Sequence, residues 1–277
     1  MDDDRTLPDA TRRWPHQKSI SPTALKTYGQ CPYRIRLQYI DRIPQPDVFV
    51  PFFAIGNATH SALGTIAQQM KVGATPIGAD QIRILCQLHM PTHQYPSEEA
   101  WEFEVQKVLR WVDLGRRYLE SLHVDDWLLI EHWESRDLPL LPSRARYTLG
   151  AKPDLVVRST DEEGEPLIHI IDYKTGKVYE EPDVPVIHRF VLRHHLQEWT
   201  GDASEANVRF TWYWLDENYR KNVDLTVEHC NYAWPNIVRQ MESLATEIAW
   251  EPTPSHMCVY CPYYQNYCTA EIPLQLD

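Results

Sequence analysis

Two neighbouring apolar segments, joined by an acidic turn, each carry an aspartate at one end. Asp154 comes directly before the apolar run Leu155–Arg158, and Asp172 lies near the end of the run Leu167–Tyr173. The turn between the two runs, residues 161–165, reads Asp-Glu-Glu-Gly-Glu, which is typical of a hairpin connection. Adjacent strands can bring both aspartates to the same end of a sheet. This pair therefore predicts a sheet with a carboxylate site at one end.

Carboxylates gathered at a strand end form a hard oxygen site that suits Mg²⁺ or Mn²⁺. Lys174 lies two residues after Asp172, and on a strand this spacing puts both side chains on one face. A lysine there can orient a nucleophile and offset charge on a phosphoryl group. The alternative is a surface ion pair, the usual role of Asp-x-Lys on a strand. The turn at Thr175-Gly176 favours a site, since it places the charges at a strand end.

The first half of the chain has the periodicity of helices, and the pattern then changes to that of strands. Helical spacing of apolar residues appears at 23–30, 56–70, 78–89 and 98–122, and Pro32 can start another helix. Ser21-Pro22 is a helix-start pair. Short apolar runs predict strands at 127–133, 144–150, 155–158, 167–173, 208–215 and 223–228, followed by a helix at 234–250 with Pro235 near its start.

These patterns predict an α/β fold. Residues 1–18 are polar and without a clear period, and we interpret them as a flexible arm. Residues 19–277 are expected to form a single domain. It would have a helical part over about 19–125, a sheet core over about 126–230, and a C-terminal helix and cysteine loop over about 231–277.

Composition limits the class of protein and the way in which it could bind a polyanion. The chain has 277 residues, 43% hydrophobic and 24% charged, which excludes whole-chain disorder and a collagen-like class. Its net charge of −12 means that nucleic acid would have to bind in a local groove. We find no apolar run of about 20 residues and no secretory signal at Met1–Arg5, so we expect a cytoplasmic protein without a membrane partner.

Three cysteines lie close together near the end of the chain, in Cys258-Val-Tyr-Cys261 and at Cys268. In a cytosolic chain, thiolates this close usually bind metal. Cys31 could supply a fourth ligand. The alternative is a zinc site made by His256 with the three C-terminal cysteines. Two further residues, Cys86 and Cys230, are interpreted as ordinary thiols.

Taken together, three motifs resemble the PD-(D/E)XK nuclease superfamily, and within it the RecB-like exonuclease branch. They are Gly56-Asn-Ala-Thr-His60, Gly150-Ala-Lys-Pro-Asp154 and Asp172-Tyr-Lys-Thr-Gly176. The resemblance implies a mixed central sheet flanked by helices, with a RecB-like nuclease domain over residues 19–277. It also implies that Mg²⁺ or Mn²⁺ is held by His60, Asp154, Asp172 and the Tyr173 carbonyl, and that Lys174 serves the attacking water. Glu131 matches an acidic position that is often seen in this family.

The cysteines extend this resemblance to AddB-type and CRISPR-associated exonucleases. The opening pattern of that group is similar to Ser21-Pro-Thr-Ala-Leu25-Lys-Thr-Tyr28-Gly-Gln-Cys31-Pro32. The resemblance implies a structural [4Fe–4S] cluster that joins the two ends of the domain and packs against the N-terminal helix. Its ligands would be Cys31, Cys258, Cys261 and Cys268.

The implied activity is metal-dependent hydrolysis of DNA, by a single-strand exonuclease acting in DNA recombination and repair or in CRISPR adaptation. Tyr28, Arg193 and Gln197 are candidate DNA contacts. The family usually carries a Gln-x-x-x-Tyr motif after its lysine, whereas the nearest match here, Gln197-Glu-Trp-Thr-Gly201, lacks the tyrosine. A catalytically weak or inactive DNA-binding iron–sulfur module is therefore one alternative, and a subunit that needs a helicase or integrase partner is another.

Basic and aromatic residues in the second half of the chain could follow a single strand by charge and stacking. The basic residues are Arg189, Arg193, His194 and His195, and the aromatic residues are Trp199, Trp212 and Tyr213. Arg34 and Arg36 form a second basic spot. For each aromatic residue taken singly, packing in the core is the favoured interpretation.

Overall fold

The computed structural model describes residues 14, 19–45, 49–138, 141, 143 and 146–271. They form two compact units. The sheet unit contains residues 49–134 and 152–232, and the end unit contains residues up to 48, residues 135–151 and residues from 233 onward. The single domain expected from the sequence stays a prediction. Apart from Trp14, which is buried, the expected flexible arm lies outside the described residues.

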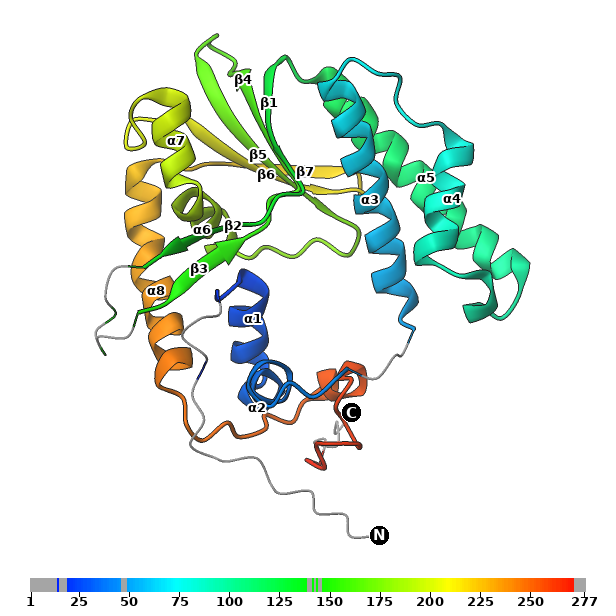
Figure 1. Cartoon of the computed structure of the whole chain (residues 1–277), viewed down its shortest axis with the longest axis vertical. Helices are drawn as coiled ribbons and strands as arrows, with labels where there is room; N and C mark the ends of the chain where they lie inside the picture. Colours follow the sequence, from blue (N-terminus) through cyan, green and yellow to red (C-terminus); the bar gives the residue numbers. More distant parts are fainter. Residues whose placement is uncertain are drawn as a thin grey trace. The chain divides into compact units, whose positions relative to one another are not determined.

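A five-stranded mixed sheet forms the centre of the sheet unit (Figure 1). Its strand order is β1-β4-β5-β6-β7. The β5–β6 pair is parallel and the other pairs are antiparallel. This confirms the mixed sheet that was expected. The strands are β1 (Val124–Ile130), β4 (Leu155–Thr160), β5 (Pro166–Lys174), β6 (Val208–Trp214) and β7 (Tyr219–Asp224).

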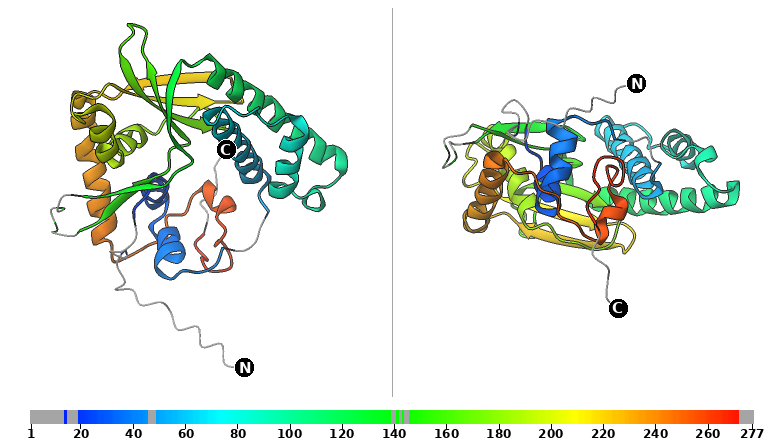
Figure 2. Two further views of the ribbon diagram at one scale, coloured as in Figure 1. Left: turned by 45° about the horizontal axis from the view of Figure 1, so that its top comes forward. Right: turned by 90° about the horizontal axis from the view of Figure 1, so that it is seen from below.

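Helices cover this sheet on both sides, with α3, α4 and α5 on one side and α6 and α7 on the other (Figures 1 and 2). A parallel strand pair needs a crossover connection, and α6 and α7 lie in the one between β5 and β6. Leu63 of α3, Val112 of α5 and Ile171 of β5 belong to one buried cluster, which joins the helices to the sheet. The bounds are α3 (Pro51–Lys71), α4 (Ala79–His89), η2 (Thr92–Gln94), α5 (Glu98–Ser121), α6 (Asp183–Val191) and α7 (Arg193–Thr200).

The end unit brings together segments from both ends of the chain. Ile20 pairs with Leu149, and the hydroxyl of Tyr28 lies 2.9 Å from Glu247 Oε2, which joins the first helix to the C-terminal segment. In this unit α1 (Pro22–Gln30) is followed by α2 (Pro32–Ile35) and a π-helical turn η1 (Arg36–Ile40). This unit also contains a short helix, η3 (His256–Tyr260), and most of a two-stranded sheet of β2 (Glu134–Asp137) and β3 (Thr148–Ala151). Glu134, the first residue of β2, is counted with the sheet unit.

Several element boundaries differ from the sequence prediction. The helix α8 runs over Val227–Thr246, so it takes residues from the strand expected at 223–228 and contains Pro235 in its interior. Thr226 caps the N-terminus of this helix, because its hydroxyl oxygen accepts a hydrogen bond from the N–H of His229. The strand expected at 127–133 ends at Ile130 instead. Residues 177–206, which the pattern left unassigned, contain α6 and α7.

Other parts of the prediction shift by a few residues. The helix expected from Gly56 begins at Pro51, because proline is favoured at the first position of a helix. Of the strand expected at 144–150, the part from Thr148 forms β3, and residues 144–145 lie outside the described residues. No helix among the described residues is both long enough and apolar enough to cross a membrane.

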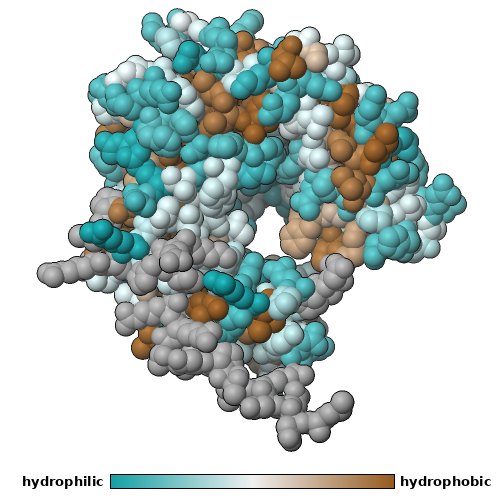
Figure 3. All heavy atoms as spheres, in the orientation of Figure 1, coloured by the Kyte–Doolittle hydropathy of each residue, from teal (hydrophilic) through white to brown (hydrophobic). Residues whose placement is uncertain are grey.

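Some apolar side chains of the sheet unit remain at its surface. Ile84 and Leu88 of α4 and Phe103 of α5 are exposed, and Figure 3 shows hydrophobic surface over these helices.

Candidate active site and metal centres

Three carboxylates lie in one row across three adjacent strands. In the antiparallel pair of β4 and β5, Leu155 is opposite Ile171, so the next residues along the ladder place Asp154 beside Asp172. On the other edge of β4, the N–H of Glu131 donates to the carbonyl of Asp154 at 2.9 Å. Glu131, which directly follows β1, therefore joins the two aspartates at the same end of the sheet.

The backbone of Glu131 turns sharply at this point. Its φ is 49°, in the left-handed region that side chains other than glycine rarely adopt. Such a conformation costs on the order of 1–3 kcal/mol and is often found at functional sites. The turn ends β1 and leaves the Glu131 carboxylate within reach of the helix α3.

Helix α3 brings His60 to the row of carboxylates. Its Nδ1 lies 3.2 Å from Asp154 Oδ1 and 3.6 Å from Glu131 Oε1. Gly56 and Gly64, one turn on either side, allow the helix to approach this closely. A Cβ at Gly56 would lie 3.2 Å from Thr175 Oγ1, and one at Gly64 would lie 3.1 Å from Glu131 Cγ.

Lys174 stands at the end of β5, on the face that carries Asp172. Its Nζ lies 2.7 Å from Asp172 Oδ2. The other aspartate is fixed by the backbone, because the N–H of Tyr173 donates to Asp154 Oδ2 at 2.7 Å. Strand register and this hydrogen bond hold the charged groups in place.

The charged groups of the site change one another's pKa values. Burial raises the pKa of Asp154, and the neighbouring Asp172 and Glu131 add to this effect. Burial alone would lower the pKa of His60, but Asp154 and Glu131 outweigh it and raise the pKa to about 10. Burial also disfavours the charged form of Lys174, but Asp172 keeps its pKa above the usual value. The site therefore concentrates negative charge that attracts cations.

The donor set fits a divalent cation. Ligand atoms of His60, Glu131 and Asp154 all lie within 4.8 Å of one another. Carboxylate oxygens with a single imidazole nitrogen suit Mg²⁺ or Mn²⁺. A surface depression adjoins the group, lined by residues that include Asn57, Gly64, Gln68 and Lys152. Solvent and ligands can reach the site from this depression.

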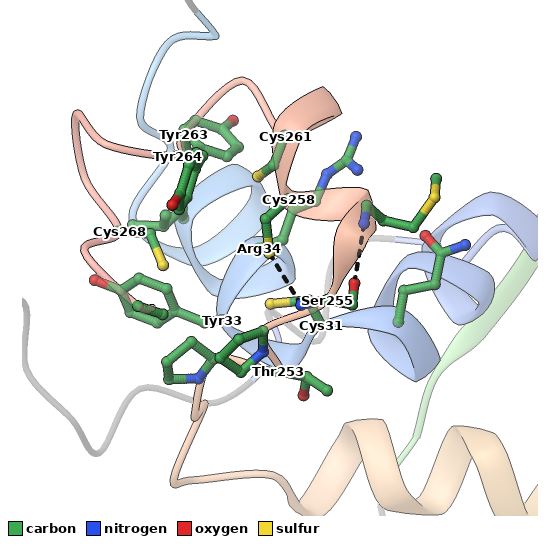
Figure 4. Close-up of a pocket in the computed structure, with 16 residues that line it drawn as sticks. Cys31, Tyr33, Arg34, Thr253, Ser255, Cys258, Cys261, Tyr263, Tyr264 and Cys268 are labelled. Atoms are coloured by element: carbon green, nitrogen blue, oxygen red, sulfur yellow. Dashed lines mark hydrogen bonds between the residues drawn. The ribbon is translucent and has the colours of Figure 1, made fainter. Parts of the chain in front are cut away.

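The four cysteines expected to act together line a single cavity in the end unit (Figure 4). Cys31 lies between α1 and α2, Cys258 lies within η3, and Cys261 and Cys268 follow in the loop. Burial raises the pKa of the Cys268 thiol, and the other three cysteines raise it further. The Cys268 thiol therefore lies within electrostatic reach of the other three cysteines.

Two observations describe what this cavity could hold. Nε of Arg34, which lines the cavity, is buried and has no hydrogen-bond partner among the described residues. Within the same residues, no three of the four sulfur atoms lie within 4.8 Å of one another, nor do two of them with His256. Ligands of one zinc ion, at about 2.3 Å from the metal, would lie about 3.8 Å apart. Taken as a group, the sulfur atoms thus do not have the spacing of the ligands of one zinc ion.

Comparison with known proteins identifies the family. The model of the PD-(D/E)XK nuclease superfamily matches residues 19–269. This chain belongs to the PD-(D/E)XK nuclease superfamily. The superfamily predicted from the motifs is thereby confirmed, while the RecB-like and AddB-type branch stays a prediction.

Two further comparisons add little to this assignment. No curated protein matches the chain. The crystal structure of SSO0001 is similar over 94% of this chain and 89% of that chain, at 14% sequence identity and a TM-score of 0.36. A similarity of this size carries no argument about fold or function.

The candidate DNA contacts of this PD-(D/E)XK protein differ in exposure. Arg193 is exposed on α7. Gln197 is engaged at the end of the same helix, where its amide donates to the Gly201 carbonyl and its Oε1 accepts the N–H of Ala203. In the end unit, the Tyr28 hydroxyl is held near Glu247. Of the three residues, Arg193 therefore has the most accessible polar group.

Most of the other basic and aromatic residues are structural. Arg189 is buried and donates to the carbonyls of Ala203 and Ala206, so its expected role on a nucleic-acid surface is wrong. Arg36 is buried beside Asp41, and the same correction applies to it. Trp212 and Tyr213 are each 2% exposed, which confirms the interpretation as core residues.

Two features of this PD-(D/E)XK protein were missed by the prediction from sequence. Lys152 lies 2.5 Å from Glu131 Oε2, and its place two residues before Asp154 could have drawn attention to it. A second group joins Glu134 to His194 and His195. No local signal links these residues, because about sixty residues separate them in the chain.

Proposed function

We propose that this chain is a metal-dependent deoxyribonuclease that cleaves single-stranded DNA as an exonuclease. One observation carries the proposal. Glu131, Asp154 and Asp172 from three adjacent strands, His60 from α3, and Lys174 converge at one end of the sheet. Because the chain belongs to a nuclease superfamily, we interpret this group of residues as a site for phosphodiester hydrolysis.

Each residue has a role in the proposed reaction. His60, Asp154, Asp172 and the carbonyl of Tyr173 would hold Mg²⁺ or Mn²⁺, with Glu131 at the edge of the set. A bound divalent cation supplies Lewis-acid stabilisation of phosphoryl oxygens and lowers the pKa of water. The Lys174 ammonium, fixed beside Asp172, donates hydrogen bonds that orient the attacking water and offset negative charge on the phosphate.

The substrate and its setting follow from the resemblance and are proposed with it. Exposed Arg193 supports contact with a phosphate backbone in a protein whose net charge is −12. DNA recombination and repair or CRISPR adaptation would be the setting, with a helicase or an integrase as the protein partner.

We also propose that Cys31, Cys258, Cys261 and Cys268 hold a structural [4Fe–4S] cluster rather than zinc. Thiolate-ligated clusters of this type are anionic, and the buried Nε of Arg34 offers a charged donor to them. The spacing of the sulfur atoms, which as a group is not that of the ligands of one zinc ion, supports a group larger than one ion.

The decisive experiment for the nuclease compares cleavage of end-labelled single-stranded DNA by the wild type and by Asp172→Asn in Mn²⁺. We expect the variant to lose activity about 10³-fold, since it loses a metal ligand and the partner of Lys174. Asp224→Asn is the matched control, because it removes an exposed carboxylate from β7 of the same sheet.

Three other outcomes would change the proposal. Equal cleavage by wild type and Asp172→Asn would exclude this site. Binding of DNA by the wild type without cleavage would support the inactive module, an outcome consistent with the engagement of Gln197 in its own helix. Cleavage that appears only after addition of a helicase or integrase fraction would support the partner-dependent subunit.

The cluster has its own test, which is independent of cleavage. Protein purified without oxygen should be brown and contain iron and acid-labile sulfide in equal amounts. A colourless protein that contains zinc and still cleaves DNA would retain the nuclease and exclude the cluster.

A further inference from the structure

A group of imidazoles surrounds one carboxylate in the sheet unit, apart from the residues proposed for catalysis. Glu134 lies at the start of β2, and its side chain is only 12% exposed. Its Oε1 lies 2.9 Å from His195 Nε2 and 3.3 Å from His132 Nε2, and its Oε2 lies 3.7 Å from His194 Nε2. Three imidazole nitrogens of the same type thus converge on one carboxylate.

The separation of these atoms matches the ligands of a transition metal. In a tetrahedral zinc site, nitrogen and oxygen ligands at about 2.0–2.1 Å from the metal lie about 3.4 Å from one another. The ligand atoms of Glu134, His194 and His195 all lie within 4.8 Å of one another. Small side-chain rotations would therefore centre an ion between them.

Two neighbours lie against the His195 ring and support the orientation in which its Nε2 faces Glu134. Glu198 Oε2 lies 3.8 Å from His195 Nδ1, whereas Nε2 of the same ring faces Glu134. A carboxylate behind a ligating histidine is the usual arrangement at metal sites. The indole of Trp199 stacks on the ring, with centroids 4.9 Å apart and planes 7° from parallel.

We propose that Glu134, His194 and His195 form a second metal site that binds Zn²⁺. Imidazole nitrogens with one carboxylate suit zinc, whereas the oxygen-rich site at Asp154 and Asp172 suits Mg²⁺ or Mn²⁺.

The position of the site indicates what the ion would do. It joins the segment that follows β1 to the start of α7, and α7 carries the exposed Arg193. A bound ion would restrain that helix, so the role is structural. The inference does not depend on the proposed nuclease activity.

Zinc titration of the full chain by calorimetry, with excess Mg²⁺ present, tests the proposal. His195→Gln and Glu134→Gln should each bind one zinc ion fewer than the wild type, or bind it at least about tenfold more weakly. His123→Gln, which removes an exposed histidine outside the group, is the matched control and should bind as the wild type does. Equal stoichiometry and affinity in all four proteins would overturn the proposal.

Two further measurements keep the test sound if a variant folds poorly. Glu198 has a side chain that is 75% exposed, so Glu198→Gln should fold normally and should weaken zinc binding about tenfold. Co²⁺ bound at this site should show no sulfur-to-metal charge-transfer band, which distinguishes it from Co²⁺ at the cysteines. Unchanged zinc affinity in Glu198→Gln and His194→Gln together would exclude the site, as would a thiolate band that accounts for all the bound Co²⁺.

Discussion

The two sites expected from the sequence are built in different ways. The carboxylates lie on three adjacent strands, and backbone hydrogen bonds of the sheet hold them in register. Cys31 lies between two short helices, and the other three cysteines lie in η3 and in the loop after it. Among the residues that the structure describes, no strand ladder connects Cys31 to the other three. Their cavity is held by a few contacts, such as the bond from the Tyr263 hydroxyl to the Ile43 carbonyl.

This difference indicates which of the two sites needs its bound ligand in order to be ordered. A sheet aligns the carboxylates before any ion binds, so the free energy of metal binding is not used to order the chain. The cysteine loop has no such framework, and a bound cluster would have to supply much of its order. We therefore expect removal of the cluster to disorder the end unit and to leave the carboxylate site intact.

The largest expected effect is the loss of the cluster in Cys31→Ser. Iron content and visible absorption should fall almost to zero, because three thiolates cannot complete the ligand set. Hydrogen exchange should increase over residues 22–45 and 255–271, whereas Mn²⁺ affinity measured by calorimetry should stay within about twofold of the wild type. Cys86→Ser is the control, since that thiol is fully buried in the sheet unit. Retention of full iron by Cys31→Ser would contradict the proposed ligand set.

A fall in pH should destabilise the sheet that positions the carboxylates. His169 is buried in β5 and bonded to Thr211, and burial lowers its pKa to about 4 from an ordinary value of 6.5. The unfolded chain binds this proton at a higher pH than the folded chain does. Stability is therefore complete above the unfolded pKa and is lost as the pH falls from 6.5 toward 4.

The size of that loss can be measured by urea unfolding of wild type and His169→Gln. Between about pH 7 and about pH 4.5, the wild type should lose roughly 2–3 kcal/mol more than the variant. Equal losses in the two proteins would show that His169 does not control the acid sensitivity of the sheet.

Packing of α3 on α5 gives the next effect. Gly115 of α5 faces Leu63 of α3, and a Cβ at Gly115 would lie 2.6 Å from Leu63 Cδ2. Gly115→Ala should therefore destabilise the protein by about 1–3 kcal/mol, although alanine is the better helix former. Because His60 is on α3, Mn²⁺ affinity should fall as well.

Gly29 in α1 of the end unit is the matched control for this substitution, since a Cβ there would meet nothing within 4 Å. Gly29→Ala should stabilise the protein by up to about 1 kcal/mol in thermal unfolding. A gain in stability from both substitutions would show that Leu63 can move aside.

The smallest effect concerns Lys152, which is partly exposed and pairs with Glu131. Lys152→Gln should change the stability by less than about 1 kcal/mol, because exposed ion pairs contribute little. It should tighten Mn²⁺ binding a few-fold, since the lysine no longer competes for that carboxylate. Weaker Mn²⁺ binding would mean that Lys152 orients Glu131 rather than competing for it.

The sequence by itself determined the type of fold and the chemistry that each motif offers. Two apolar runs joined by an acidic turn predicted the hairpin of β4 and β5, and because a hairpin is local, its two aspartates could be placed together from their positions in the chain. The apolar stripes of α3 and α5 also predicted those helices, because burial of one face dictates their period.

Only the tertiary structure decided which distant residues meet. The helix α3 places His60 beside Asp154 through close approach at Gly56 and Gly64, and no local pattern encodes that contact. The same holds for Glu134 with His195, since the two residues come from separate elements about sixty residues apart in the chain. Burial likewise determined that Arg189 is a core residue, because a sequence shows that a residue is charged but not how exposed its side chain is.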